Sequence, residues 1–179
     1  MSLYHHVANK DGLLDALADW IFAAIDLPGS EQPWRAAMSE RASSARTVLS
    51  AHPWALGLIE SRRSPGPALL HHHDTVIGCL LRAGFPIALA SHAFSVIDAY
   101  VYGFVLTEQN LPFAPEEGAA EEFVAGIDLP RDDYPHLVEV ATTLLSKDYT
   151  YGDEFAYGLD LILDALEVRL AAGRDADPG

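Results

Sequence analysis

Apolar residues recur along this chain at the three- and four-residue spacing of amphipathic helices, and no stretch sustains the alternation expected of a strand. The pattern therefore predicts an all-α fold. The expected helices cover residues 11–25, 33–50, 54–61, 68–83, 86–109, 135–145 and 152–172. Residues 111–133 are rich in proline and acidic side chains and should form a surface loop, with one or two helical turns around 116–125.

Polar and turn-forming residues mark the ends of several helices. Asn9 or Asp11 can cap the first helix, and Gly84 is suited to end the helix over 68–83. The helix over 86–109 carries Asp98 as its only formal charge between residues 87 and 107. A helix that is apolar nearly all round is expected to be buried on more than one side.

The last helix carries a continuous apolar stripe, which predicts a two-fold interface formed together with the helix over 86–109. Gly103 and Gly158 would allow two helices to approach closely. The residues expected at this dimer interface are Val101, Phe104, Phe155, Gly158, Leu159, Ile162, Leu163, Leu166 and Leu170. The alternative is that both helices belong only to the core of one chain.

Composition narrows the possible function classes. The 179 residues are 50% hydrophobic and 21% charged, which argues against disorder. A single cysteine, Cys79, excludes an intrachain disulfide framework and a multi-cysteine zinc site. The uninterrupted apolar runs are too short for a bilayer and the N-terminus lacks the pattern of a signal peptide, so we expect a cytoplasmic protein without membrane contact.

The formal charge of −15 is distributed unevenly. Residues 1–82 carry seven basic and eight acidic side chains, a net charge of −1, whereas residues 83–179 carry four basic and eighteen acidic ones, a net charge of −14. Because DNA phosphates repel an acidic surface, any contact with DNA should come from the first part of the chain.

Residues 2–14 carry a family resemblance. They read Ser-Leu-Tyr-His-His-Val-Ala-Asn-Lys-Asp-Gly-Leu-Leu, which resembles the end of the helix-turn-helix domain of TetR-family transcriptional repressors. In that family the recognition helix carries a Leu-Tyr-x-His-Val type sequence, followed by Asn-Lys and a helix with Leu-Leu. The rest of the chain is similar to the C-terminal regulatory domain of the tetracycline-repressor-like branch, through the segments at 52–54, 98–104 and 155–167.

The resemblance implies that residues 1–10 are a remnant of the DNA-binding helix-turn-helix and that residues 11–179 bind an effector and dimerise. Tyr4 and Lys10 would contact phosphates, and Ser2 and His5 would lie near base edges. The alternative is that residues 1–7 are a frayed leader. The family has two helices before the recognition helix and this chain starts without them, so as written it should bind operator DNA poorly.

Several polar and aromatic residues are candidates for effector binding. Asp98 is a lone carboxylate in an apolar helix and needs a partner, either Arg46, Arg82 or a ligand. His73 lies on an apolar helix face and is either a hydrogen-bonded core histidine or a ligand contact. The full set of candidate ligand-binding residues is Trp20, Trp54, His73, Ile77, His92, Asp98 and Tyr100. For the aromatic members, ordinary core packing is the alternative.

Metal and catalytic chemistry have little support. The run His71-His72-His73 cannot chelate one ion from one helix, because successive helical residues point about 100° apart. No phosphate-binding loop, nucleophile elbow or two-histidine metal motif is present, so we expect no cofactor, no metal and no enzyme activity. The sequence thus indicates a TetR-like transcriptional regulator, acting as a repressor, that forms a homodimer and responds to an unidentified small molecule. The alternative is a stand-alone helical small-molecule carrier or sensor without DNA binding.

Overall fold

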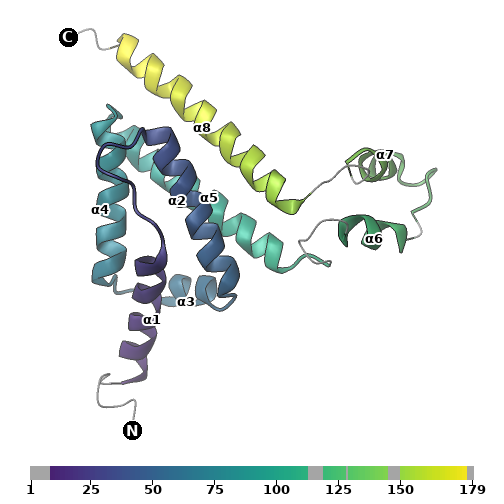
Figure 1. The fold of residues 1–179 in the computed structure, drawn as a ribbon, viewed down its shortest axis with the longest axis horizontal. Helices are drawn as coiled ribbons and strands as arrows, with labels where there is room; N and C mark the ends of the chain where they lie inside the picture. Colours follow the sequence, from purple (N-terminus) through teal and green to yellow (C-terminus); the bar gives the residue numbers. More distant parts are fainter. Residues whose placement is uncertain (1–8, 113–118, 128, 145–149, 177–179) are drawn as a thin grey trace.

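The computed structural model describes residues 9–112, 119–127, 129–144 and 150–176, which form helices joined by loops (Figure 1). Within these ranges there is no strand, so the predicted all-α class is confirmed. The helices are α1 (Lys10–Ala24), α2 (Trp34–Ala51), α3 (Ala55–Ser61), α4 (Pro67–Arg82), α5 (Ile87–Gln109), α6 (Ala119–Ala125), α7 (Pro135–Leu144) and α8 (Tyr151–Ala176). The predicted bounds agree closely except that α8 continues to Ala176, beyond the predicted end at residue 172.

The predicted signals at two helix ends are present in the structure. The side chain of Asn9 accepts a hydrogen bond of 2.8 Å from the backbone N–H of Gly12, and so caps α1. Gly84 follows α4 with a φ of 90°, a conformation that glycine adopts without the steric cost of a Cβ atom.

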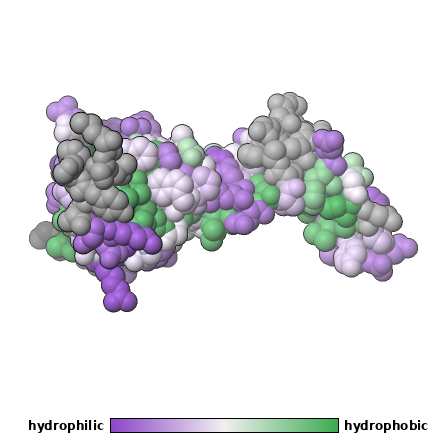
Figure 2. All heavy atoms as spheres, turned by 90° about the horizontal axis from the view of Figure 1, so that it is seen from below, coloured by the Kyte–Doolittle hydropathy of each residue, from purple (hydrophilic) through white to green (hydrophobic). Residues whose placement is uncertain are grey.

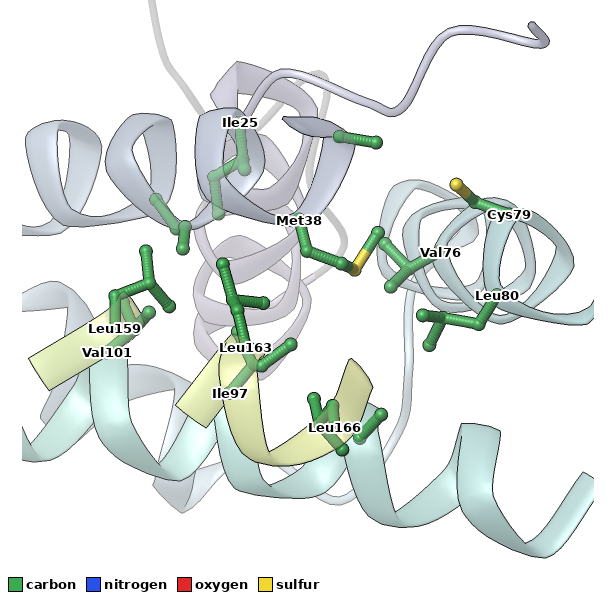
Figure 3. Close-up of a cluster of buried hydrophobic side chains, with 14 of the residues drawn as sticks. Ile25, Met38, Val76, Cys79, Leu80, Ile97, Val101, Leu159, Leu163 and Leu166 are labelled. Atoms are coloured by element: carbon green, nitrogen blue, oxygen red, sulfur yellow. The ribbon is translucent and has the colours of Figure 1, made fainter. Parts of the chain in front are cut away.

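Helix α5 lies at the centre of the bundle and packs against α2, α4 and α8, while α1 packs against α2, α3 and α4. The apolar faces of these helices meet in one core. Figure 3 shows Met38 of α2, Val76 of α4, Ile97 of α5 and Leu163 of α8 within it. All four side chains are inaccessible to solvent.

Helix α5 is also the one helix among the described residues that is long and apolar enough to span a bilayer. The length of uninterrupted apolar runs did not predict such a helix, because Ser91, His92 and Ser95 break the runs. The mean hydropathy of the whole helix nevertheless stays high. In this fold three helices pack against α5, which gives its apolar composition a role in the protein core.

The apolar stripe of α8 packs inside its own chain. The buried members of the set predicted for a dimer interface are Val101, Phe155, Leu159, Leu163, Leu166 and Leu170, and all belong to the single core cluster. Phe104 and Ile162 are partly buried against the same cluster. The burial corrects the assignment of this stripe to a second copy, because periodicity shows that a face is apolar but does not show which helix covers it.

Gly158 does allow close approach of two helices, and these are α8 and α5 of one chain. A Cβ atom on Gly158 would lie 2.3 Å from the Tyr100 hydroxyl oxygen. That hydroxyl donates hydrogen bonds to the backbone oxygens of Glu154, at 3.1 Å, and Phe155, at 3.0 Å. By contrast, a Cβ atom on Gly103 would meet nothing within 4 Å.

Helices α6 and α7 lie apart from the other helices (Figure 1). Helix α7 and the turn before it leave Tyr134, Leu137 and Val140 at least half exposed. Apolar surface is visible at this end of the molecule (Figure 2). This end therefore contributes little to the core that positions the candidate site.

Candidate functional site

Three polar side chains meet inside the bundle, where α2, α4 and α5 pack together. Arg41, His72 and Asp98 are 3%, 1% and 8% exposed, and they are the buried polar or charged residues among the described positions. The Nη2 atom of Arg41 donates to Oδ1 of Asp98, forming an ion pair. The Nε atom of Arg41 donates to Nε2 of His72 at 3.0 Å. Buried charges are costly unless paired, and this arrangement pairs them.

Each member reaches the interior because its helix turns that face inward. Arg41 lies on the buried face of α2, together with Met38, Ala45 and Leu49. His72 lies on the buried face of α4 with Val76 and Leu80, and Asp98 lies beside Ile97 and Val101 on α5. The cluster therefore depends on the relative rotation of three helices.

The interior environment sets the protonation states. Burial and the positive charge of Arg41 lower the pKa of His72 to about 3, so its imidazole is neutral at pH 7. Because Nε2 of His72 accepts from Arg41, the proton of this neutral ring resides on Nδ1. Burial raises the pKa of Asp98, and the ion pair with Arg41 partly offsets that shift.

Two hydrogen-bond donors of the cluster have no partner among the described residues. They are Nη1 of Arg41 and Nδ1 of His72, and both atoms are shielded from solvent. Buried polar groups without partners are rare in folded proteins because each costs roughly 1–3 kcal/mol. The free donors are thus the feature of this site that suggests a bound molecule.

Aromatic rings surround the cluster. The Arg41 guanidinium carbon lies 5.6 Å from the ring centre of Phe94. Phe94 also makes an edge contact with His73, with ring centres 4.6 Å apart. Phe22 makes an edge contact with His72, with ring centres 5.6 Å apart. Apolar walls with a few polar groups are typical of small-molecule sites.

A cavity of about 190 Å³ adjoins the cluster through Phe22, beneath the loop between α3 and α4. Its lining residues are Asp15, Ala18, Asp19, Phe22, Ile59, Arg62, Arg63, Ser64, Pro65, Gly66 and Leu69. Pockets for drug-sized ligands are larger, about 300–1,000 Å³. Phe22 lines this cavity and also contacts His72, whereas Arg41, His72 and Asp98 are not among the lining residues.

A second, larger hollow of about 470 Å³ lies beside Arg46 and Glu108. Its charged groups already have partners, because Arg46 forms an ion pair with Glu108, and Ser50 Oγ donates to Glu108 Oε2 at 2.9 Å. The Arg46 guanidinium also lies about 5 Å from the ring centres of Phe104 and Phe155. These contacts link α2, α5 and α8, so the group around Arg46 is better explained as stabilising the packing of these helices.

Two of the candidate ligand-binding residues lie at the central cluster. Asp98 is a member, although its partner is Arg41 and neither Arg46 nor Arg82 as predicted. His73 is only partly buried and contacts Phe94 and Phe22. The fully buried histidine is its neighbour His72, which was not among the predicted ligand-binding residues.

The remaining candidates are dispersed. Trp20 and Trp54 are about half exposed and both contact the ring of His52 on the outer surface. Ile77 is partly buried on α4. Tyr100 serves the contact between α5 and α8 described above.

His92 lies on an exposed face of α5 that includes several small side chains. The exposed residues of this face, all within about a third of the helix circumference, are Ala88, His92, Ser95, Val96, Ala99, Gly103 and Leu106. Helix α8 has a comparable second stripe, on which Tyr157, Leu161 and Val168 are 66%, 55% and 70% exposed. Exposed apolar faces of this kind mark candidate protein interfaces.

The residues predicted to contact DNA lie mostly outside the described part of the chain. Ser2, Tyr4 and His5 fall there, and Lys10 is exposed at the first position of α1. In the described ranges, no group of three or more histidine, cysteine, aspartate or glutamate residues is arranged to hold a metal ion.

Comparisons with known proteins agree on one family. The sequence model described as "Tetracyclin repressor-like, C-terminal domain" matches residues 27–170. A protein of Saccharopolyspora erythraea named HTH-type transcriptional regulator is 34% identical over 137 residues, which are 76% of this chain and 58% of that protein. The HTH-type transcriptional repressor DrrR1 of Streptomyces coeruleorubidus is 29% identical over 186 residues, covering 97% of this chain and 67% of the relative.

The fold matches solved structures of the same kind. A possible TetR family transcriptional regulator from Streptomyces coelicolor A3(2) superimposes with a TM-score of 0.71 at 26% identity. The match covers 93% of this chain and 82% of that structure. Similarity in sequence and in fold therefore extends over nearly the whole helical bundle.

Proposed function

This chain belongs to the tetracycline-repressor-like (TetR) family, and from that premise we propose that it is the effector-binding and dimerising part of a transcriptional repressor. The observation that carries the proposal is the family match over residues 27–170, which enclose the whole buried polar cluster. The named relatives, a transcriptional regulator and a transcriptional repressor, support this class of function over an enzyme.

The effector binds at the cluster of Arg41, His72 and Asp98, between the rings of Phe22 and Phe94. Two free donors in an aromatic setting support this position. A ligand that entered from the neighbouring cavity would have to move Phe22, because this residue lines the cavity and its ring contacts His72. A ligand that binds one position of Phe22 better than another shifts the population of the two states.

Helix α1 connects the site to the N-terminal segment. Phe22 lies on α1, and so does Asp15, which receives a 2.6 Å hydrogen bond from Nε of Arg62 in the loop after α3. A rearrangement at Phe22 would therefore act on the helix that follows the segment predicted to read DNA. Ser2, Tyr4, His5 and Lys10 remain the predicted DNA contacts, and the repressor would act on operator DNA in the cytoplasm.

A homodimer forms through the exposed faces of α5 and α8, in place of the buried stripe. The small residues Ala99 and Gly103 on α5 would let a second copy approach closely, and Leu161 and Val168 on α8 would add apolar contact area. Homodimers usually place the same patch of both copies across a two-fold axis. Two such faces would hold two DNA-reading segments at a set distance.

The dimer is tested by measuring mass with light scattering. The wild-type chain should give about twice its 19.4 kDa, and the double variant Leu161→Arg with Val168→Arg should give a folded monomer, because two charges would be buried without partners at the interface. The control is Leu70→Arg, since Leu70 is 54% exposed on α4, away from this face.

The control variant should remain a dimer, and circular dichroism should show equal helix content in all three proteins. A monomeric wild type, or an unchanged dimer in the double variant, would contradict this interface. A monomeric wild type would also favour a helical carrier without DNA binding, because one reading segment cannot recognise a two-fold operator.

A further inference from the structure

Three aspartates of α1 face the chain segment that joins α3 to α4. Asp11, Asp15 and Asp19 are spaced four residues apart, so their side chains project from one face of the helix. Each of them accepts a hydrogen bond from residues 62–69. This face of α1 is therefore held to the rest of the bundle by polar contacts.

Arg62, the residue that follows α3, makes two of these three connections. Its Nε atom donates to Oδ1 of Asp15 at 2.6 Å, and its Nη1 and Nη2 atoms lie 3.5 Å from Oδ1 of Asp11. The side chain of Arg62 is 20% exposed, whereas those of Asp15 and Asp11 are 36% and 80% exposed. Because a guanidinium carries several N–H donors in one plane, this single side chain bridges two successive turns of α1.

The third connection lies further along α1 and depends on a glycine. Oδ1 of Asp19 accepts a 3.0 Å hydrogen bond from the backbone N–H of Leu69, in the first turn of α4. A Cβ atom on Gly66 would overlap the carboxylate of Asp19, so a residue without a side chain is needed for this approach. This contact fixes the middle of α1 and leaves its first turns to Arg62.

The two halves of α1 are held in different ways. The buried residues of this helix, Ala18, Ile21 and Phe22, all lie in its C-terminal half. Among residues 10–17, every residue is exposed or only partly buried, and none belongs to the core cluster. Apolar burial therefore holds the C-terminal half more firmly, and the Arg62 bridge supplies the specific contacts of the first turns.

We propose that Arg62 is a positioning residue for α1, and that its bridge to Asp15 and Asp11 keeps the first turns of this helix against the bundle. When the bridge breaks, residues 10–17 open as a local unit while the core stays folded. This inference rests on the proposed function for its biological meaning, because the segment predicted to contact DNA directly precedes α1. The bridge would then set where that segment lies relative to the bundle.

The experiment is native-state hydrogen exchange of the full chain followed by NMR, in which low concentrations of urea show how much surface each opening exposes. Wild-type amides of residues 14–17 should exchange faster than those of residues 97–105 in α5, and their rates should hardly change with urea. Such a pattern means that the first turns of α1 open without unfolding the core. Because this comparison uses the wild type, it does not depend on whether a variant folds.

Arg62→Met tests the bridge itself, and Arg63→Met is the matched control. Both changes remove one positive charge from the same loop, but Arg63 is exposed and has no hydrogen bond or ion pair with the described part of the chain. In Arg62→Met the amides of residues 14–17 should exchange roughly three- to tenfold faster, because a charge-assisted hydrogen bond and its ion pairs are lost. The control should exchange as the wild type does. Adding Asp15→Asn to Arg62→Met should cause little further change, since both substitutions remove the same contact.

Two results would overturn the positioning role. One is equal exchange of residues 14–17 in the two arginine variants. The other is a single opening free energy and urea dependence shared by residues 14–17 and 97–105, which would mean that the bridge only adds to global stability. Neither measurement uses DNA, an effector or the dimer interface. Failure of the bridge therefore leaves the proposed function in place, whereas a monomeric mass in light scattering rejects the proposed function and leaves the exchange result unchanged.

Discussion

Removing one member of the buried ion pair between Arg41 and Asp98 should lower the free energy of unfolding far more than replacing both members with apolar residues. The variants are Arg41→Met, Asp98→Leu and the two combined. The two side chains are only 2% and 11% exposed, so each single change leaves an uncompensated charge in the protein interior. Such losses lower the free energy of unfolding by about 3–5 kcal/mol.

The double variant should be much less destabilised than the sum of the two single variants. Replacing both charges by apolar residues of similar volume is often close to neutral. One loss remains, because His72 Nε2 no longer receives the 3.0 Å hydrogen bond from Arg41, and an unpaired buried acceptor costs about 1–3 kcal/mol. Independent effects would sum to about 6–10 kcal/mol, so the coupling should be at least about 3 kcal/mol.

The assay is urea denaturation followed by circular dichroism at one fixed chain concentration, since dimerisation makes stability depend on concentration. At acidic pH the Arg41→Met variant should regain stability relative to wild type, because Asp98 can then become neutral; its pKa is already raised by burial. Single variants nearly as stable as wild type, or a double variant that shows the sum of the two losses, would contradict a coupled buried ion pair.

Three further outcomes are expected. The free energy of unfolding should fall by up to about 1.4 kcal/mol per pH unit as pH drops from 6.5 towards 3. The reason is that His72 takes up a proton in the unfolded chain but stays neutral in the native chain, where its pKa is about 3. Denaturation of the His72→Gln variant should lack this pH-dependent loss. Gly158→Ala should lower the free energy of unfolding by about 1–3 kcal/mol, because the added Cβ atom would displace the Tyr100 hydroxyl. The control is Gly57→Ala, which adds a Cβ atom in open space on α3 and should raise thermal stability slightly. Asn9→Ala should lower stability by about 1 kcal/mol in the same melts through loss of the α1 cap, and an unchanged melting temperature would contradict that role.

The sequence predicted only part of the ion pairing at the site. That Asp98 needed a partner followed from a lone carboxylate in an apolar helix, but Arg46 and Arg82 were the expected partners. Arg46 instead pairs with Glu108. A usable signal existed, because Arg41 falls at helical spacing among Met38, Ala45 and Leu49 on the apolar face of α2. A charge inside such a stripe indicates a buried partner.

The histidine run shows that periodicity alone does not identify which of two adjacent residues is buried. His72 and His73 are adjacent, and a rotation of about 100° separates their directions on α4. The apolar pattern of α4 is too broad to decide between them. Packing against Arg41 and Phe22 places His72 in the interior and leaves His73 at its edge.

The spacing of residues along the chain was enough to predict the positions of the helices, a cap at Asn9 or Asp11, the turn at Gly84 and the all-α class, because these depend on contacts a few residues apart. The packing of the helices shows which apolar stripe of α8 is core, which arginine pairs with Asp98 and which histidine is buried. Those outcomes depend on how helices distant in sequence cross and rotate against each other. Periodicity shows that a helix has an apolar face, but it carries no information about the partner that covers it.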